Sequence, residues 1–96
     1  MKKTKIIGIL IRDRIKEAGK LQILLSSHNE IIRSRLGFHE LSQEVCSRVG
    51  IIILTLDGNP DEWKPFEKEL SAIEGIEFKE MLFNYWKEEK WIPSEF

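Results

Sequence analysis

The stretch RSRLGFHELSQEVCSRVGIIIL, from Arg33 to Leu54, holds the residue types best suited to metal chemistry. It contains the only cysteine of the chain, Cys46, and one of the two histidines, His39. Imidazole and thiolate are natural ligands for zinc, nickel and copper, and His28 is a further donor. A closed site needs about four ligands, and the chain has neither a CxxC nor an HxH pair. We expect no resident metal, and keep as an alternative a site of His28, His39 and Cys46 shared between subunits.

Nucleophilic catalysis is the other chemistry that Cys46 could carry. It requires a base within hydrogen-bond reach and an oxyanion hole. His39 lies seven residues away across a polar segment, a spacing that permits contact without requiring it. The glycines are scattered and form no phosphate-binding loop. A lone small thiol beside a strand is typical of a buried apolar filler, so we expect neither enzymatic activity nor a cofactor.

Length and charge narrow the class of protein. The 96 residues fit one domain. Fifteen Lys and Arg residues against 16 Asp and Glu give a net charge of −1, which provides no general attraction to nucleic acid or to anionic lipid. The apolar run from Ile6 to Ile11 is too short for a secretory signal or a membrane span, so we expect no membrane association. With a single cysteine, a reducing cytoplasmic setting is expected.

Hydrophobic patterning predicts four strands and two helices. The strands are expected at about residues 5–12, 30–38, 49–56 and 76–83, the helices at 13–27 and from residue 60 to about 73, and a polar loop at 39–47. Asp13 and Asn59 are predicted N-caps, and Pro60 suits the first position of the second helix. Gly75 is placed to end that helix in a left-handed conformation.

This β-α-β-β-α-β order predicts a ferredoxin-like α+β fold, with a four-stranded antiparallel sheet and both helices on one face. The first and third strands are then central, and in this chain both are apolar on both faces. Two helices leave one such face uncovered, which is unusual for a monomer. We therefore expect a homo-oligomer, a dimer or a tetramer, with an interface that contains Ile6, Leu10, Ile52, Leu54, Tyr85, Trp86 and Trp91.

The chain divides into a domain over residues 1–84 and an aromatic tail over residues 85–96. Tyr85, Trp86 and Trp91 stand among several charges in this tail, a composition typical of an anchor for a surface. The tail either folds back over its own sheet or grips a partner. The second case leaves open a module that serves only in protein assembly.

RNA-recognition domains share this element order and stack bases on aromatic side chains of the third strand. Here that strand reads RVGIIILTL, without an aromatic residue. Arg33 and Arg35 are expected to form a short basic row on the second strand, which a solvated edge explains equally well. We expect no direct contact with nucleic acid.

The segment EIIRSRLGF, followed after a polar loop by VGIIILTLDGNPDEWKPFEKELSAIEGIEFKEMLF, resembles the small ACT-like regulators named for the iron-only hydrogenase system. In that family an R-x-G motif plus an aromatic or aliphatic residue ends the second strand, a hydrophobic third strand ends near D-G, and G-V/I-x-x-K begins the last strand. The matching positions are residues 35–38, residues 51–58, the apolar stripe over 63–73, and Gly75, Ile76 and Lys79. The resemblance spans about residues 5–83.

The resemblance implies a non-enzymatic, ligand-sensing, oligomeric regulator that binds a small molecule at subunit interfaces, near the first strand–helix turn and the edge strands. Helix N-termini and arginine side chains suit carboxylates, which favours an amino-acid-like or anionic effector. The expected contacts are Arg12, Asp13, Arg14, Arg35, Gly37 and Phe38. If the protein regulates transcription, a separate regulatory protein is expected to touch the DNA, because only a few residues precede the first strand.

The C-terminal domain of nickel-responsive repressors, related in fold, uses an H-x-H motif and a later cysteine around the same hairpin. This chain has Gly37 and His39 where paired histidines are expected, and the spacing to Cys46 is one residue longer. This difference in motif and spacing argues against nickel binding. A metal-responsive regulator stays an alternative to the effector sensor.

Overall fold

The computed structural model describes residues 2–41 and 46–85, apart from the side chains of residues 14, 15, 38–41 and 46–48. The elements along the chain are β1 (Lys2–Ile11), α1 (Arg14–Ser27), β2 (Ile32–Leu41), β3 (Cys46–Leu56), the 3₁₀ turn η1 (Pro60–Glu62), α2 (Trp63–Ser71) and β4 (Ile76–Tyr85). This is the predicted β-α-β-β-α-β order.

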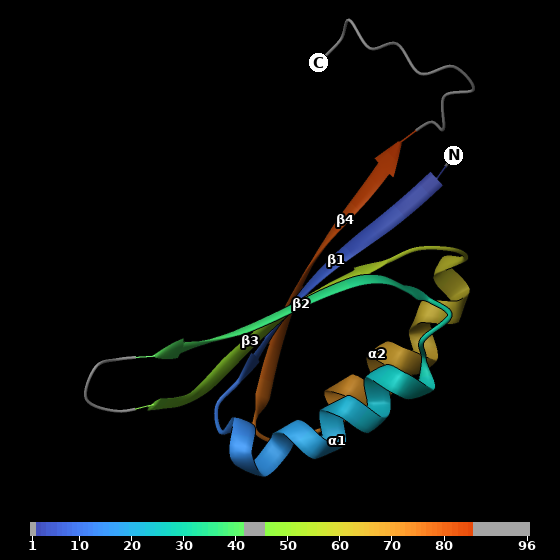
Figure 1. The fold of residues 1–96 in the computed structure, drawn as a ribbon. Helices are drawn as coiled ribbons and strands as arrows, with labels where there is room; N and C mark the ends of the chain where they lie inside the picture. Colours follow the sequence, from blue (N-terminus) through green and yellow to red (C-terminus); the bar gives the residue numbers. More distant parts are fainter. Residues whose placement is uncertain (1, 42–45, 86–96) are drawn as a thin grey trace, which may run out of the picture.

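The four strands form one antiparallel sheet in the order β2-β3-β1-β4, so that β1 and β3 are central. Both helices lie on the same side of this sheet (Figure 1). The predicted ferredoxin-like α+β fold is confirmed. None of the helices in the described part of the chain is long and apolar enough to cross a bilayer.

One hydrophobic core lies between the helices and the sheet face that they cover. Alternate residues of the central strands form its sheet side, because successive side chains of a strand point to opposite faces. These are Ile7, Ile9 and Ile11 of β1 and Ile52, Leu54 and Leu56 of β3, packed against Leu21, Leu24 and Leu25 of α1 and Trp63, Phe66 and Leu70 of α2. The α2 residues recur at steps of three and four, which confirms the predicted apolar stripe of that helix.

The buried face of β3 differs from the one assigned from the sequence. Ile52 is 8% exposed and Leu54 is fully buried, so the prediction that these two residues form an uncovered interface is wrong. Their register against buried residues of β1 places them on the face that the helices cover. Ile51 and Ile53 lie on the uncovered face instead. A strand that is apolar on both faces does not itself determine which face the helices cover.

The hairpin strands and the last strand extend farther than predicted. His39 and Cys46, expected in a loop, lie in β2 and β3. Pairing of the backbone satisfies its N–H and C=O groups whatever the side-chain pattern. β4 ends at Tyr85 and so includes the first residue assigned to the tail, whereas Trp86 and Trp91 lie outside the described residues.

Polar side chains cap the starts of both helical segments, as predicted. The backbone N–H of Lys16 donates to Oδ1 of Asp13 at 3.3 Å. The backbone N–H of Asp61 donates to Oδ1 of Asn59 at 3.0 Å, which opens η1 ahead of α2. Such acceptors satisfy the first N–H groups of a helix, which have no preceding turn to bond.

Gly75, between α2 and β4, has a left-handed backbone with φ +83°. A Cβ at this position would lie 3.0 Å from Cγ of Glu17, a side chain of the first turn of α1 that is 4% exposed. The backbone N–H of Arg12 donates to the Gly75 carbonyl at 3.0 Å. Glycine therefore permits both the turn into β4 and the close approach of α1.

The substitution Gly75→Ala is expected to lower the free energy of unfolding by about 1–2 kcal/mol, because alanine disfavours the left-handed conformation and its Cβ crowds Glu17. Gly19→Ala is the matched control, since Gly19 lies in α1 with nothing within 4 Å of its added Cβ. It is expected to raise the same free energy by about 0.5–1 kcal/mol. Urea denaturation measures the free energy of unfolding of both variants. Changes of the same sign would contradict this account of Gly75.

Candidate functional site

The residues predicted to bind an effector occupy separate parts of one subunit. The Arg12 side chain, after β1, is 65% exposed, with Nη2 3.9 Å from Oε1 of Glu77. Asp13 follows it and caps α1. Arg35 lies in β2 and donates from Nη2 to Oε1 of Gln22, on α1, at 2.9 Å. Arg12 and Asp13 are thus together, whereas Arg35 is held against the helix.

The remaining predicted contacts lie along β2 and at the start of α1. Gly37 pairs with Ile52 and Phe38 with Ile51 in the sheet. The side chains of Phe38 and Arg14 lie outside the described residues. The effector site predicted from the sequence therefore stays a prediction.

The candidate metal ligands do not come together within one subunit. Nε2 of His28 lies 2.8 Å from Oε2 of Glu69, and its ring packs edge-on against Phe66. The length of β2 separates His28 from His39 by on the order of 20 Å. The side chains of His39 and Cys46 are outside the described residues. Among the side chains that the structure describes, no three His, Cys, Asp or Glu are grouped to hold a metal ion.

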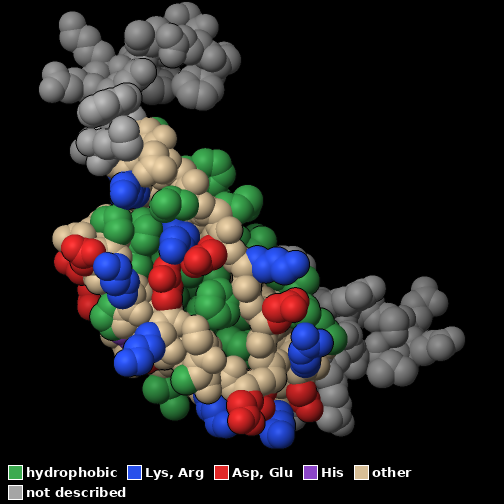
Figure 2. All heavy atoms as spheres, turned by 180° about the vertical axis from the view of Figure 1, so that it is seen from behind, with side chains coloured by type: hydrophobic (Ala, Val, Ile, Leu, Met, Phe, Trp, Pro, Cys, Tyr) green, Lys and Arg blue, Asp and Glu red, His purple; other side chains and the backbone are tan. Residues whose placement is uncertain are grey.

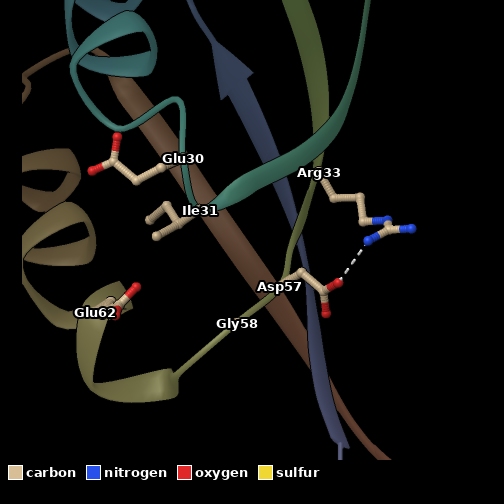
Figure 3. A pocket seen from close by; sticks show the side chains of 6 residues that line it. All are labelled: Glu30, Ile31, Arg33, Asp57, Gly58 and Glu62. Carbon is tan, nitrogen blue, oxygen red and sulfur yellow. Dashed lines mark hydrogen bonds and ion pairs between the residues drawn. The ribbon is translucent and has the colours of Figure 1, made fainter. Parts of the chain in front are cut away.

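Asp57, directly after β3, joins three strands and α2. Its Oδ2 lies 3.1 Å from Nη1 of Arg33 on β2 and 3.3 Å from Nζ of Lys2 on β1. The Thr4 hydroxyl donates to its Oδ1 at 3.4 Å, and Nε1 of Trp63 donates to its backbone carbonyl at 3.0 Å. Arg33 and Asp57 face one another in Figure 3. The Asp57 side chain is only 18% exposed, so water screens these contacts weakly.

The surroundings of Asp57 keep its carboxylate ionised. Burial by itself raises the pKa of Asp57, but the hydrogen bond and charge of Lys2, the charge of Arg33 and the backbone N–H of Gly58 outweigh that effect and hold the pKa below its ordinary value of 3.8. A carboxyl whose pKa is lowered by folding stabilises the folded state above its unfolded pKa. That contribution is lost as the pH falls through the folded pKa.

Two open hollows flank the ion pair of Arg33 and Asp57. The first, of about 460 Å³, also has Glu30 and Glu62 in its lining (Figure 3). Three carboxylates against one guanidinium make it unsuitable for an anion. The second, of about 550 Å³, is lined by Lys2, Thr4, Arg33, Ser34, Thr55, Asp57 and Tyr85. We call it the hydroxyl hollow, because four of these side chains carry a hydroxyl group.

A second cluster of charges ties β1 to α2 and β4. Nζ of Lys5 pairs with Glu67 of α2, lies 3.1 Å from Oε2 of Glu80 on β4, and stands 5.5 Å from the ring centroid of Trp63. Burial by itself lowers the pKa of Lys5, but the two carboxylates outweigh it, and the pKa is raised above 10.5. Lys5 is fully compensated by its neighbours, so this cluster has a structural role.

The sheet face opposite the helices, here called the open face, is apolar at its centre. Strand register and alternation place on it Ile6, Leu10, Leu36, Ile51, Ile53, Met81 and Phe83. Leu36 is 62% exposed, Met81 56% and Phe83 49%. A hollow of about 250 Å³ lies beside Gly8, where an added Cβ would meet nothing within 4 Å, and its lining contains Leu10 and Ile51 together with the charged Glu77 and Lys79. The open face thus offers apolar side chains and an unfilled depression.

The charged side chains form no extended patch of one sign on the face shown in Figure 2. Acidic and basic groups are interspersed there, with hydrophobic side chains between them. This distribution agrees with the net charge of −1 and provides no broad electrostatic field on that face.

From the sequence, Asp57 was placed only in the D-G pair that ends the third strand. Its cationic partners lie on other strands, and no local pattern indicates them. The predicted basic row of Arg33 and Arg35 is wrong, because a register shift at the start of β2 gives them different partners, Asp57 and Gln22. The only sequence feature that could have drawn attention to Asp57 is its position as an aspartate directly after an apolar strand.

The topology defines the class of protein: a small ferredoxin-like α+β domain. Residues 3–80 match the family described as "TM1266-like: Iron-only hydrogenase system regulator, putative". The chain belongs to this family, which confirms the resemblance found in the sequence.

A solved structure agrees with this assignment. The uncharacterized protein TM1266 from Thermotoga maritima is 26% identical, with a TM-score of 0.71, over 88% of this chain and 100% of that chain. SnoaB, a cofactor-independent oxygenase from Streptomyces nogalater, has a TM-score of 0.54 at 8% identity, over 93% of this chain and 98% of that chain. At that identity the second likeness concerns the fold alone. Among curated proteins the sequence has no match.

The substitution Asp57→Asn is expected to lower the free energy of unfolding at pH 7 by about 1–3 kcal/mol, because it removes a partly buried carboxylate from two cations. The difference from the parent should shrink as the pH falls below 3.8, where the unfolded carboxyl is protonated and the contribution of the folded carboxylate is being lost. Urea denaturation of the parent and the variant, from pH 7 to below pH 3.8, measures this difference in the free energy of unfolding.

Asp61→Asn is the control for this experiment. The Asp61 side chain is 78% exposed and pairs only at the surface with Lys64, so the expected change is below about 0.5 kcal/mol. Equal losses in the two variants at pH 7 would contradict the special role of Asp57.

Proposed function

We propose that this chain is a non-enzymatic regulatory module of the iron-only hydrogenase system that assembles into a homo-oligomer through its open face and responds to a small anionic effector. The regulatory role is supported by family membership. The assembly is supported by one observation above the others, the exposed apolar centre of the open face. The effector is the further step of the proposal and rests on Arg12, Asp13 and Arg35.

A second copy of this chain is the partner that best fits the open face. Both central strands contribute apolar side chains to it, and the edge strand β4 adds Met81 and Phe83, each about half exposed. Association of such faces removes apolar area from water, which contributes about 25 cal/mol per Å². The depression beside Gly8 is suited to receive a side chain of the second copy. A two-fold axis makes the face its own complement.

The effector is proposed to bind where the turn after β1 approaches a neighbouring subunit. The Arg12 guanidinium is exposed and its contact with Glu77, at 3.9 Å, is long, so it is available for a carboxylate. Arg35 is exposed and makes one hydrogen bond, to Gln22. Arg35 lies on the helix side of the edge strand β2, so the shared site of this proposal requires contact between subunits at that edge in addition to the open face.

The substitution Ile53→Glu is expected to dissociate the oligomer while leaving the fold intact, because Ile53 is 37% exposed on the open face and is absent from the core. A carboxylate there loses its hydration when two faces meet. Light scattering after size exclusion measures the mass. Ile23→Glu, on the exposed side of α1 at 71% exposure, is the matched control and should keep the parent mass. An unchanged mass for Ile53→Glu would refute assembly through this face.

Effector binding is testable by thermal shift of the metal-stripped protein against amino acids, organic acids, nucleotides and divalent metals. A ligand at about 100 times its Kd stabilises the fold by about 2.7 kcal/mol, which raises Tm by roughly 10 °C in a domain of this size. A rise with one class of anionic metabolite is expected. A rise with metals alone, lost in Cys46→Ala, would instead favour the metal-responsive alternative.

The substitution Arg35→Gln should weaken the binding of an effector found in that panel. It should lower the free energy of unfolding by only about 0.5–1 kcal/mol, because a single exposed hydrogen bond is lost. Lys68→Gln removes the same charge from an exposed position of α2 and serves as the control. Equal affinities of the parent and the Arg35 variant would remove Arg35 from the site.

A further inference from the structure

The hydroxyl hollow is built by all four strands at the end of the sheet where β1 begins. β1 provides Lys2 and Thr4, and β4 provides Tyr85. On the other side, β2 provides Arg33 and its neighbour Ser34, while Thr55 and then Asp57 come from the end of β3. β1 is ten residues long, so this hollow lies about 30 Å from the turn that carries Arg12. It is therefore far from the Arg12 and Asp13 part of the effector site proposed above. Arg35 follows Ser34 in β2, but its side chain lies on the other face of the sheet, against Gln22 of α1.

The charged side chains that line this hollow are two cations and one carboxylate, which leaves an excess of one positive unit in the lining. Asp57 places one carboxylate oxygen, Oδ2, near both Lys2 and Arg33, so a single negative charge faces two cations. Arg33 uses only Nη1 in this contact, and its side chain is 68% exposed. A guanidinium carries five N–H donors in a fixed fork, so several of them are available to a ligand.

Hydroxyl groups supply further donors in the same hollow. Ser34 and Thr55 are register partners, and within the described residues neither hydroxyl has a hydrogen-bond partner. The hydroxyls of Thr4 and Tyr85 lie 3.1 Å apart, and Nζ of Lys2 stands 5.9 Å from the Tyr85 ring centroid. A guanidinium fork, an ammonium and hydroxyls from different strands surround a volume of about 550 Å³.

We propose that the hydroxyl hollow binds the phosphate group of a small phosphorylated metabolite. A phosphate group carries about −1.5 to −2 charge and three strong acceptor oxygens, which suits donors that approach from several strands. A planar carboxylate is matched by the arginine fork alone and leaves the hydroxyls of Ser34 and Thr55 unused. Asp57 orients Lys2 and Arg33 and limits the excess charge, which favours a compact anion over a long polyanion.

The test is a titration of the isotopically labelled full chain with inorganic phosphate, at an ionic strength held constant with sodium chloride, followed by amide NMR. Saturable shifts of the amides of Ser34, Thr55 and Tyr85 are expected. Acetate should bind at least about tenfold more weakly, which corresponds to about 1.4 kcal/mol. Arg33→Gln and Ser34→Ala should each lower the affinity for phosphate, the first by about tenfold. Lys68→Gln, the charge-matched control, should not.

Each other outcome counts against the proposal. The absence of saturable shifts at the highest soluble phosphate concentration would overturn it. So would shifts centred on Arg12, or an affinity that falls equally in the Arg33 and Lys68 variants, because either result would indicate another site or general charge attraction. The hollow lies at one end of the open face, and phosphate binding there requires neither assembly through the apolar centre of that face nor an effector at Arg35. A failure here is therefore distinguishable from a failure of the proposed function.

Discussion

Two helices can cover only one face of this sheet, and both central strands are apolar on both faces. Because of this constraint, one apolar face of the sheet forms the core and the other stays uncovered in the single chain. On the covered face, Ile7, Ile9 and Leu54 are fully buried beneath the helices. On the open face the same strands present Ile51 and Ile53. A sequence selected only for a stable monomer has no need of such residues on the open face, where polar side chains keep an uncovered sheet soluble.

Charged side chains join several elements at the end of the sheet where β1 begins. Asp57 connects β1, β2 and α2 at the point where β3 ends, and Lys5 connects β1 to α2 and β4. Both groups are largely shielded from water, and each has opposite charges beside it. Such pairs contribute specificity of arrangement as much as stability, because their partners lie on different elements. At Asp57 the compensation leaves one cation in excess, and that excess distinguishes it from the fully compensated Lys5.

The order of the elements was predictable from the sequence, because apolar periodicity, the caps Asp13 and Asn59 and the glycine at position 75 all act locally. The choice of sheet face was not. Ile51 to Leu54 are all apolar, so a shift by one residue exchanges the faces without changing the pattern. The extent of the hairpin was also missed, since His39 and Cys46 are held in strands by backbone pairing.

The candidate sites were less predictable than the fold. Arg12 and Asp13 could be placed together because they follow one another in the chain. The partners of Asp57 could not, since Lys2 and Arg33 reach it from two other strands through a register shift that has no sequence signal. Residues on different strands that contact one another can be identified only when the register of the strands is known. The proposed effector contacts Arg12 and Arg35 are also hard to place from the sequence, because in the proposal their approach to one another depends on contact between subunits.

The most direct test of the central claim is the mass of the unmodified chain in solution, by sedimentation equilibrium over a wide range of protein concentrations. The account predicts a dimer or a tetramer with a concentration-dependent approach to a fixed even-numbered mass. A chain that stays monomeric at every concentration would contradict it. The exposed apolar centre of the open face would then need another explanation.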